Sequence, residues 1–183
     1  SISRDSFRVI SEGRTLETLD RGQAFREAHQ GAVLLHQGDQ YLVDSMDIAQ
    51  GIVRVSRTEV DYYTRPLKSV DIQIKRVLEG TKLKDTAVSF GEVEVTEQYY
   101  AYKIIRKDTL LGVEPLELPP LRFSTRALWF SPPPGTEDRI RSEGHDFEGG
   151  LHGAEHAFIA MMPMYVLCDR WDIGGVSMPV HAE

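Results

Sequence analysis

The chain has 183 residues, enough for one domain or for one domain with an appendage. Its composition, 41% hydrophobic and 27% charged, is that of a globular protein and excludes a disordered one. The net charge of −7 argues against a protein built mainly to coat nucleic acid, because such proteins are usually basic.

Residues 7–64 predict short strands with one helical segment. The strands FRVI and TLETL flank a Glu-Gly turn, and residues 21–28, RGQAFREA, place their apolar side chains at helical spacing. The segments AVLLHQG, QYLVDSMD and GIVRVSRTEVDYYT then alternate or run apolar, and glycine-containing turns separate them. This order predicts a β-meander.

Residues 69–130 continue as strands. VDIQIKRVL alternates apolar and polar residues, and EGTKLKD predicts a turn. The next segment, AVSFGEVEVTEQYYAYKIIRK, predicts two strands or one long bent strand, in which Gly91 is expected to form a bulge. Prolines at 115, 119 and 120 limit the segment LGVEPLELPPLRFSTRALWF to loops and edge strands.

The sequence SPPPG at 131–135 marks a change from strand to helix. TEDRIRSEG predicts one helix, with Thr136 as N-cap and acidic residues in the first turn. A second helix is predicted from about Phe147 through Cys168, with a kink at Pro163.

The predicted fold class is therefore α+β, with a curved or barrel-like antiparallel sheet followed by a C-terminal helical segment. Two parts are expected: a β-rich accessory domain over residues 1–130 and a helical segment over residues 131–183.

A cytoplasmic location is expected from the cysteine content. The single cysteine, Cys168, excludes an internal disulfide and a cysteine-based zinc cluster within the chain, and a reducing compartment is the simplest interpretation. The longest apolar run, residues 157–168, is too short to cross a bilayer, and the polar first residues do not form a signal peptide. The missing initial Met and the abrupt end suggest a piece of a longer protein.

HGAEH at residues 152–156 is the sharpest motif, because it matches the H-x-x-E-H pattern of a zinc peptidase. On a helix, His152, Glu155 and His156 share one face, as a zinc ligand set requires. A zinc-dependent hydrolase is thus one hypothesis. However, a third ligand would have to come from a short tail, so these three residues are predicted to be structural, partly buried and hydrogen-bonded, with no metal.

CDRWDIGG at residues 168–175 concentrates charged and aromatic side chains after the helix. Asp169, Arg170 and Asp172 are expected to form an ion-pair network that fixes a chain reversal, and Cys168 is expected to be a small buried apolar residue. The alternative is that Arg170 binds a phosphate and Trp171 stacks on a base.

YYAYKIIRK at residues 99–107 interleaves tyrosines with cations, the two components of a track for single-stranded nucleic acid. Its candidate contacts are Tyr100, Lys103, Arg106 and Lys107. Because alternate residues of a strand face inward, some of the tyrosines are instead expected in the core.

Two His-Gln-Gly triplets begin at His29 and His36, and each glycine is expected at a turn or a close backbone approach. These histidines could contact nucleic acid, but hydrogen bonding at strand ends is the favoured role. The chain contains no Walker A loop and no Asp-Glu-Ala-Asp or Asp-Glu-Ala-His box, so no ATP chemistry is expected from it.

Three segments in order, HQGAVLLHQGDQYLVDSMD, IVRVSRTEVDYYT and GGLHGAEHAFIAMMPMYVLCDRWDIGGVS, resemble the region that follows the motor domains in one family of DEAD/DEAH-box (superfamily 2) helicases, the mitomycin-repair type. The resemblance spans most of residues 25–178. It implies a parent protein that is an ATP-dependent DNA helicase used in repair, with ATP, Mg²⁺ and a four-cysteine zinc cluster outside this chain. The motor domains and DNA, expected to be single-stranded, would be its partners.

The leading hypothesis is a non-catalytic accessory domain of such a helicase, which helps to guide nucleic acid or couples the zinc region to the motor. The zinc-dependent hydrolase is one alternative. A protein-interaction β-module is another, which the acidic net charge keeps open.

Overall fold

A computed structural model of the chain describes residues 5–168 and 173–178. The described chain divides into two compact units. The first unit comprises residues 1–74 and 93–125, and the second comprises residues 75–92 and 126–183. In the described residues no helix is long and apolar enough to cross a membrane.

The first unit contains a five-stranded sheet in the order β2-β1-β5-β4-β3. Its strands are β1 (Ser6–Ser11), β2 (Arg14–Asp20), β3 (Val33–His36), β4 (Asp39–Asp47) and β5 (Ile52–Thr58). The predicted meander is confirmed for β3, β4 and β5, which pair antiparallel in chain order. The β1–β5 pair is parallel, a departure from the all-antiparallel sheet that was predicted. A parallel pair needs a long crossover, and the chain between β1 and β5 supplies one.

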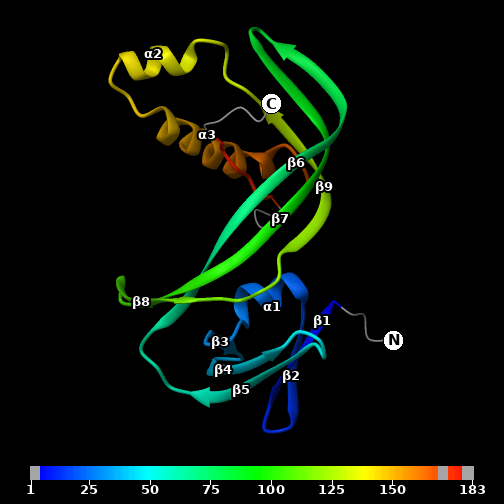
Figure 1. Ribbon diagram of the computed structural model, residues 1–183, viewed down its shortest axis with the longest axis vertical. Helices are drawn as coiled ribbons and strands as arrows, with labels where there is room; N and C mark the ends of the chain where they lie inside the picture. Colours follow the sequence, from blue (N-terminus) through cyan, green and yellow to red (C-terminus); the bar gives the residue numbers. More distant parts are fainter. Residues whose placement is uncertain (1–4, 169–172, 179–183) are drawn as a thin grey trace. The chain divides into compact units, whose positions relative to one another are not determined.

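The helix α1 (Arg21–Glu27) covers this sheet with its apolar side (Figure 1). Its Ala24 and Phe25 are fully buried in one core with Phe7 and Val9 of β1 and Val53 of β5. The strand residues alternate inward because successive side chains of a strand point to opposite faces. The helix predicted at residues 21–28 is therefore confirmed, and packing of its apolar side on the sheet is what stabilises it.

Asp20 fixes the start of α1 with a capping box. Its carboxylate accepts a hydrogen bond from the backbone N–H of Gln23 at 2.8 Å, and the Gln23 side chain accepts one from the Asp20 N–H at 3.3 Å. Two backbone donors that a helix start would leave unpaired are thereby satisfied.

The second sheet is built on a long hairpin of β6 (Tyr63–Leu83) and β7 (Thr86–Arg106). β7 pairs along its other side with β8 (Thr109–Pro115) and with β9 (Leu121–Phe130), so both lie at an edge. Pro115 ends β8, and the pair at 119–120 precedes β9, which confirms the edge assignment that the prolines predicted. β7 is one strand, which decides between the two predicted possibilities.

Gly91 in β7 is needed for close approach. A Cβ at this position would overlap the backbone oxygen of Arg76 and would lie 3.0 Å from the Trp129 ring. The close approach gives a steric reason for glycine at this position, because only glycine allows the neighbouring strands to come this near. The predicted bulge stays a prediction.

Two helices follow, as predicted, with α2 at Thr136–Ser142 and α3 at Phe147–Met161. Two details of the prediction are wrong. Gly135, with φ of 78°, occupies the N-cap position, and the Thr136 hydroxyl donates to the Pro133 carbonyl at 2.7 Å instead.

The second error concerns where α3 ends. The helix stops at Met161, gives way to a short 3₁₀ turn, η1 (Met162–Met164), and does not continue to Cys168. Pro163 within that turn has no N–H to donate and its ring clashes with the preceding helical carbonyl, so it ends the α-helix rather than bending it.

The fold class is α+β with a curved sheet and C-terminal helices, as the sequence predicted. The predicted division at residue 131 separates a part of the chain that is mainly strand from a part that is mainly helix. The compact units divide the chain differently, because β6, β7 and β9 each continue from one unit into the other.

Candidate nucleic-acid interface

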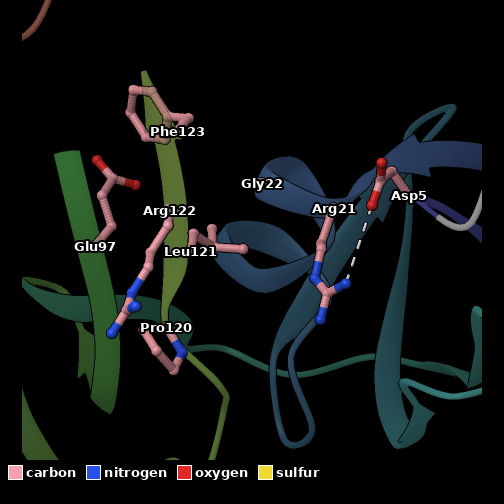
Figure 2. Close-up of a pocket in the computed structure, with 8 residues that line it drawn as sticks. All are labelled: Asp5, Arg21, Gly22, Glu97, Pro120, Leu121, Arg122 and Phe123. Carbon is pink, nitrogen blue, oxygen red and sulfur yellow. Dashed lines mark ion pairs between the residues drawn. The ribbon is translucent and has the colours of Figure 1, made fainter. Parts of the chain in front are cut away.

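An open cleft of about 490 Å³ lies in the first unit (Figure 2). The start of α1, the middle of β7 and the start of β9 supply its walls. Its lining residues are Asp5, Arg21, Gly22, Glu97, Pro120, Leu121, Arg122 and Phe123.

Local sequence rules place these residues. The capping box at Asp20 sets the start of α1 at Arg21. The prolines at 119 and 120 cannot donate strand hydrogen bonds, so β9 begins after them, at Leu121. Arg122 and Phe123 are neighbours on a strand, so their side chains point to opposite sides. Figure 2 shows both side chains on β9, with the Phe123 ring farther along the strand than Arg122.

The two acidic residues of the cleft each have a cationic neighbour. Asp5 lies 4.0 Å from the guanidinium of Arg21, and Glu97 lies 2.5 Å from the Lys68 ammonium. Arg122 is exposed, and no hydrogen bond or ion pair of its side chain is found among the described residues. Of the two arginines that line the cleft, Arg21 is paired with a carboxylate and Arg122 is not in the described part of the chain, so Arg122 is the more available to bind an anionic ligand.

Phe123 adds an aromatic surface to the cleft lining, from the other side of β9 than Arg122. The residue is 46% exposed, so its ring is accessible to a ligand. An exposed ring can stack on a base, and an arginine of the same cleft can contact a phosphate of the strand. Sequence reasoning missed this site, whose signal in the chain is the Arg-Phe pair within LRFSTR.

The residues of YYAYKIIRK, predicted to bind nucleic acid as one track, lie on two opposite faces of β7. Tyr99 is buried in the core, whereas Tyr100 is 49% exposed, as strand alternation requires. Lys103 lies four residues after Tyr99, so strand alternation places it on the same face as Tyr99 and on the opposite face from Tyr100. The predicted mixture of core and surface is confirmed, but Tyr100 and Lys103 do not form one continuous track.

The two remaining cations of the predicted track lie near the β7–β8 turn. Arg106 forms an ion pair with Asp61 at 2.9 Å, which partly neutralises it. Lys107 is exposed at the turn itself, with φ of 43°. Binding of nucleic acid by these residues stays a prediction.

The histidine of the first His-Gln-Gly triplet is buried, whereas its glutamine is exposed. His29 is fully buried, its ring lies 4.7 Å from the Tyr102 ring, and its Nδ1–H donates to the Gln30 carbonyl at 3.1 Å. Burial lowers the pKa of His29 and raises the pKa of Tyr102. A Cβ on Gly31, whose φ is 82°, would overlap the Tyr102 hydroxyl, so the glycine is required for close packing.

The second triplet lies at a strand end, as predicted. His36 ends β3, and its Nδ1 lies 3.3 Å from Glu17 Oε1. Gly38, with φ of 89°, is in the following turn.

The HGAEH motif is helical as predicted, but the prediction that both histidines are partly buried is wrong. The side chain of His152 is 64% exposed and His156 is exposed, whereas Glu155 is only 15% exposed. The least exposed row of α3 runs at four-residue spacing through 147, 151, 155 and 159, of which Phe147 and Ile159 are buried and the other two half-buried. Each histidine follows a member of this row by one residue, which turns it about 100° away from the packed side.

The segment CDRWDIGG is described only at its ends. Asp169, Arg170, Trp171 and Asp172 lie outside the described residues, so their predicted ion pairs and nucleic-acid contacts stay predictions. Cys168 is half-buried rather than buried. Over residues 5–168 and 173–178, no group of three or more His, Cys, Asp or Glu side chains is arranged to hold a metal ion.

The second unit exposes many large apolar side chains. Its buried apolar residues in the described chain are Phe147 and Ile159. Exposed ones occur on β6, β9, α3 and the residues that follow: Val77, Leu78, Leu83, Leu128, Phe130, Phe158, Met161, Met164, Tyr165, Val166, Leu167, Val176 and Met178. Exposed apolar surface on this scale is typical of a protein-contact surface.

Comparison with known proteins gives the context of these surfaces. No protein-family model matches the chain. It is 28% identical over 170 residues to the uncharacterized ATP-dependent helicase YprA of Bacillus subtilis, a match that covers 92% of this chain and 22% of YprA. It is 25% identical over 170 residues to the ATP-dependent helicase HRQ1 of Saccharomyces cerevisiae, covering 89% of this chain and 16% of HRQ1. The chain is homologous to a region of ATP-dependent helicases.

Solved structures share the fold of this helicase region. The DUF1998 helicase MrfA bound to DNA matches with a TM-score of 0.69 and 24% identity, over 97% of this chain and 24% of MrfA. MrfA in a second crystal structure matches with a TM-score of 0.60 and 21% identity, over 92% of this chain. The resemblance inferred from the sequence is thereby confirmed. The chain spans between about a sixth and a quarter of the length of these relatives, and the zinc cluster stays a prediction.

Proposed function

We propose that the chain is a non-catalytic accessory region of an ATP-dependent DNA helicase, in which it guides DNA and couples the motor to a zinc region. The observation that carries this proposal is the sequence match to YprA over 92% of the chain. ATP, Mg²⁺ and zinc then belong to the whole helicase rather than to this region. Its motor domains are the same-chain partner, and the cytoplasm is the proposed location.

The cleft of the first unit is the proposed DNA contact. Arg122 supplies a cation without a described carboxylate partner, and Phe123 supplies an exposed ring. This pair suits single-stranded DNA, whose unstacked bases offer faces to aromatic side chains. MrfA, which shares this fold, has been crystallised bound to DNA, and this supports DNA as the ligand class.

The exposed apolar side chains of the second unit support docking on the motor domains. This unit buries few apolar side chains of its own, and small units with little buried apolar surface are marginally stable alone. Contact with a neighbouring domain would bury these side chains and would connect the accessory region mechanically to the motor.

The hydrolase alternative requires more ligands than the described residues supply. A catalytic zinc takes three protein ligands and keeps one position open. His152 and His156 provide two, and Glu155 would be the base. The protein-interaction β-module is the second candidate, because the exposed apolar surface and the acidic net charge fit it as well as they fit the helicase accessory region.

Fluorescence anisotropy with labelled single-stranded DNA at low salt tests the proposed contact. Arg122→Ala should weaken binding and reduce the magnitude of the salt slope by about 0.7, because one contact to a single-strand phosphate is lost. Phe123→Ala should weaken binding without changing the slope, because stacking releases no counterions. The exposed Arg14→Ala in the β1–β2 hairpin is the matched control.

The triple variant Lys103→Ala, Arg106→Ala and Lys107→Ala tests the β7 residues separately. If only the triple variant weakens binding, the contact lies at the β7–β8 turn and the cleft is not the site. Unaltered binding in every variant would remove both surfaces from the proposal.

A further inference from the structure

We propose that His152 and His156 form a two-histidine site for a divalent transition metal on the exposed side of α3, with Glu155 as a positioning carboxylate. Nothing in the helicase proposal requires this site, and it rests on different residues. The expectation of no metal at these residues rested on the lack of a third protein ligand for a catalytic zinc. A two-histidine site needs no third protein ligand, and the exposure of both histidines leaves its other coordination positions open to solvent.

The two ring nitrogens are at chelating distance. Nε2 of His152 and Nε2 of His156 lie 3.1 Å apart, and the rings are steeply inclined, with centroids 4.4 Å apart. A Zn–N bond of about 2.0–2.1 Å to each nitrogen gives an N–metal–N angle of about 100°. That angle falls between the octahedral and the tetrahedral value, so one ion can bind both nitrogens without a change of backbone.

The second nitrogen of His152 lies near a carboxylate. Its Nδ1 lies 3.4 Å from Glu155 Oε2. This contact is at ion-pair distance and is not a hydrogen bond. A rotation of the carboxylate that let it accept from Nδ1–H would favour the tautomer in which Nε2 keeps its lone pair. Metal-ligating histidines commonly donate their other N–H to a carboxylate, which fixes the tautomer and the ring orientation.

Glu155 is itself held in place. It belongs to the least exposed row of α3, and the backbone of Gly175 packs against it. A Cβ on Gly175 would lie 3.1 Å from Glu155 Cγ and 2.7 Å from Ile159 Cδ1, so a larger residue there would displace the carboxylate. The glycine after the Cys-Asp-Arg-Trp-Asp segment thereby acquires a role in orienting the motif.

The chemistry of the site selects the metal class. Two imidazoles suit Zn²⁺, Cu²⁺ and Ni²⁺ and disfavour Mg²⁺ and Ca²⁺, which prefer oxygen ligands. Residues 131–183 carry 9 acidic and 3 basic side chains, which favours cation binding. Without the ion, one Nε2–H donates to the other Nε2, and the metal replaces that proton. At least two coordination positions stay open for water or for a ligand from another molecule.

Isothermal titration of untagged chain with Zn²⁺ at pH 7.5 tests this site. One ion per chain is expected. His152→Ala and His156→Ala should each weaken binding at least tenfold because the chelate is lost, and Glu155→Gln should weaken it about tenfold. His145→Ala, which removes an exposed histidine just before α3, should change it less than twofold. Far-UV circular dichroism shows whether each variant keeps its fold.

Cu²⁺ electron paramagnetic resonance gives a second readout that stability does not affect. Two equatorial nitrogen ligands are expected in the native chain and one in each single histidine variant. Absence of Zn²⁺ binding, equal affinity in His152→Ala and the native chain, or loss of binding in His145→Ala would overturn the proposal.

Discussion

His29 shows how one buried side chain sets a pH dependence at the residue scale. Its ring is fully buried, and its Nε2 has no hydrogen-bond partner among the described residues. Burial penalises the charged imidazolium and lowers the pKa of His29 below its ordinary value of 6.5, although the hydrogen bond to the Gln30 carbonyl acts in the opposite direction. The folded chain therefore keeps this histidine neutral where the unfolded chain would protonate it.

This difference predicts acid sensitivity. Below pH 6.5 the unfolded state binds more protons than the folded state, so the stability present above pH 6.5 is lost as the pH falls toward the lowered pKa. Urea denaturation from pH 7.5 to pH 5 should show a falling midpoint in the native chain. In His29→Leu the fall should be smaller, whereas the exposed-site control His145→Gln should behave like the native chain. An unchanged fall in His29→Leu would show that other groups cause the acid sensitivity.

The histidines also show the limit of residue-level prediction. Sequence spacing correctly placed His152, Glu155 and His156 together on a helix. It could not show which side of that helix packs, because that depends on the row through Phe147 and Ile159 and on what lies against it. The Arg-Phe pair of the cleft was missed for a related reason, since its significance comes from the neighbouring start of α1 rather than from its own sequence.

At the scale of elements, turns and alternation were sufficient to predict most strands. The glycine turn before β4, the alternating start of β6 and the prolines around β8 and β9 all act locally, so the sequence contains their signal. The parallel pairing of β1 with β5 is a long-range event with no local signal. The early end of α3 follows from one proline whose effect, a kink or a stop, depends on packing after it.

The capping box of α1 gives a prediction at this scale. Asp20→Ala removes the carboxylate that accepts from the Gln23 N–H, and α1 has only seven residues to compensate. The free energy of unfolding should fall by about 1 kcal/mol, within a usual range of about 0.5–2 kcal/mol. Asp20→Asn, which keeps an acceptor oxygen, is the matched control in chemical denaturation. Equal losses in both variants would mean that charge rather than capping stabilises this helix.

At the scale of the whole molecule, the two units carry different kinds of surface. The first unit has a large shared core and a cleft with an unpaired arginine among the described residues, whereas the second exposes most of its large apolar side chains. This contrast fits a region that contacts nucleic acid with one unit and protein with the other. Composition alone could not predict it, because an average over the chain conceals where apolar residues remain exposed.

Binding of single-stranded DNA by the intact chain tests the central claim most directly. Anisotropy of a labelled strand of about 30 nucleotides should be measured between about 50 and 200 mM salt, with a duplex of the same sequence as comparison. We predict binding at low salt that favours the single strand, with a log–log salt slope of about −1.4 to −3 for about two to four phosphate contacts. No binding at the lowest salt concentration, or binding that is independent of salt, would contradict the assignment of this chain as a DNA-guiding region of a helicase.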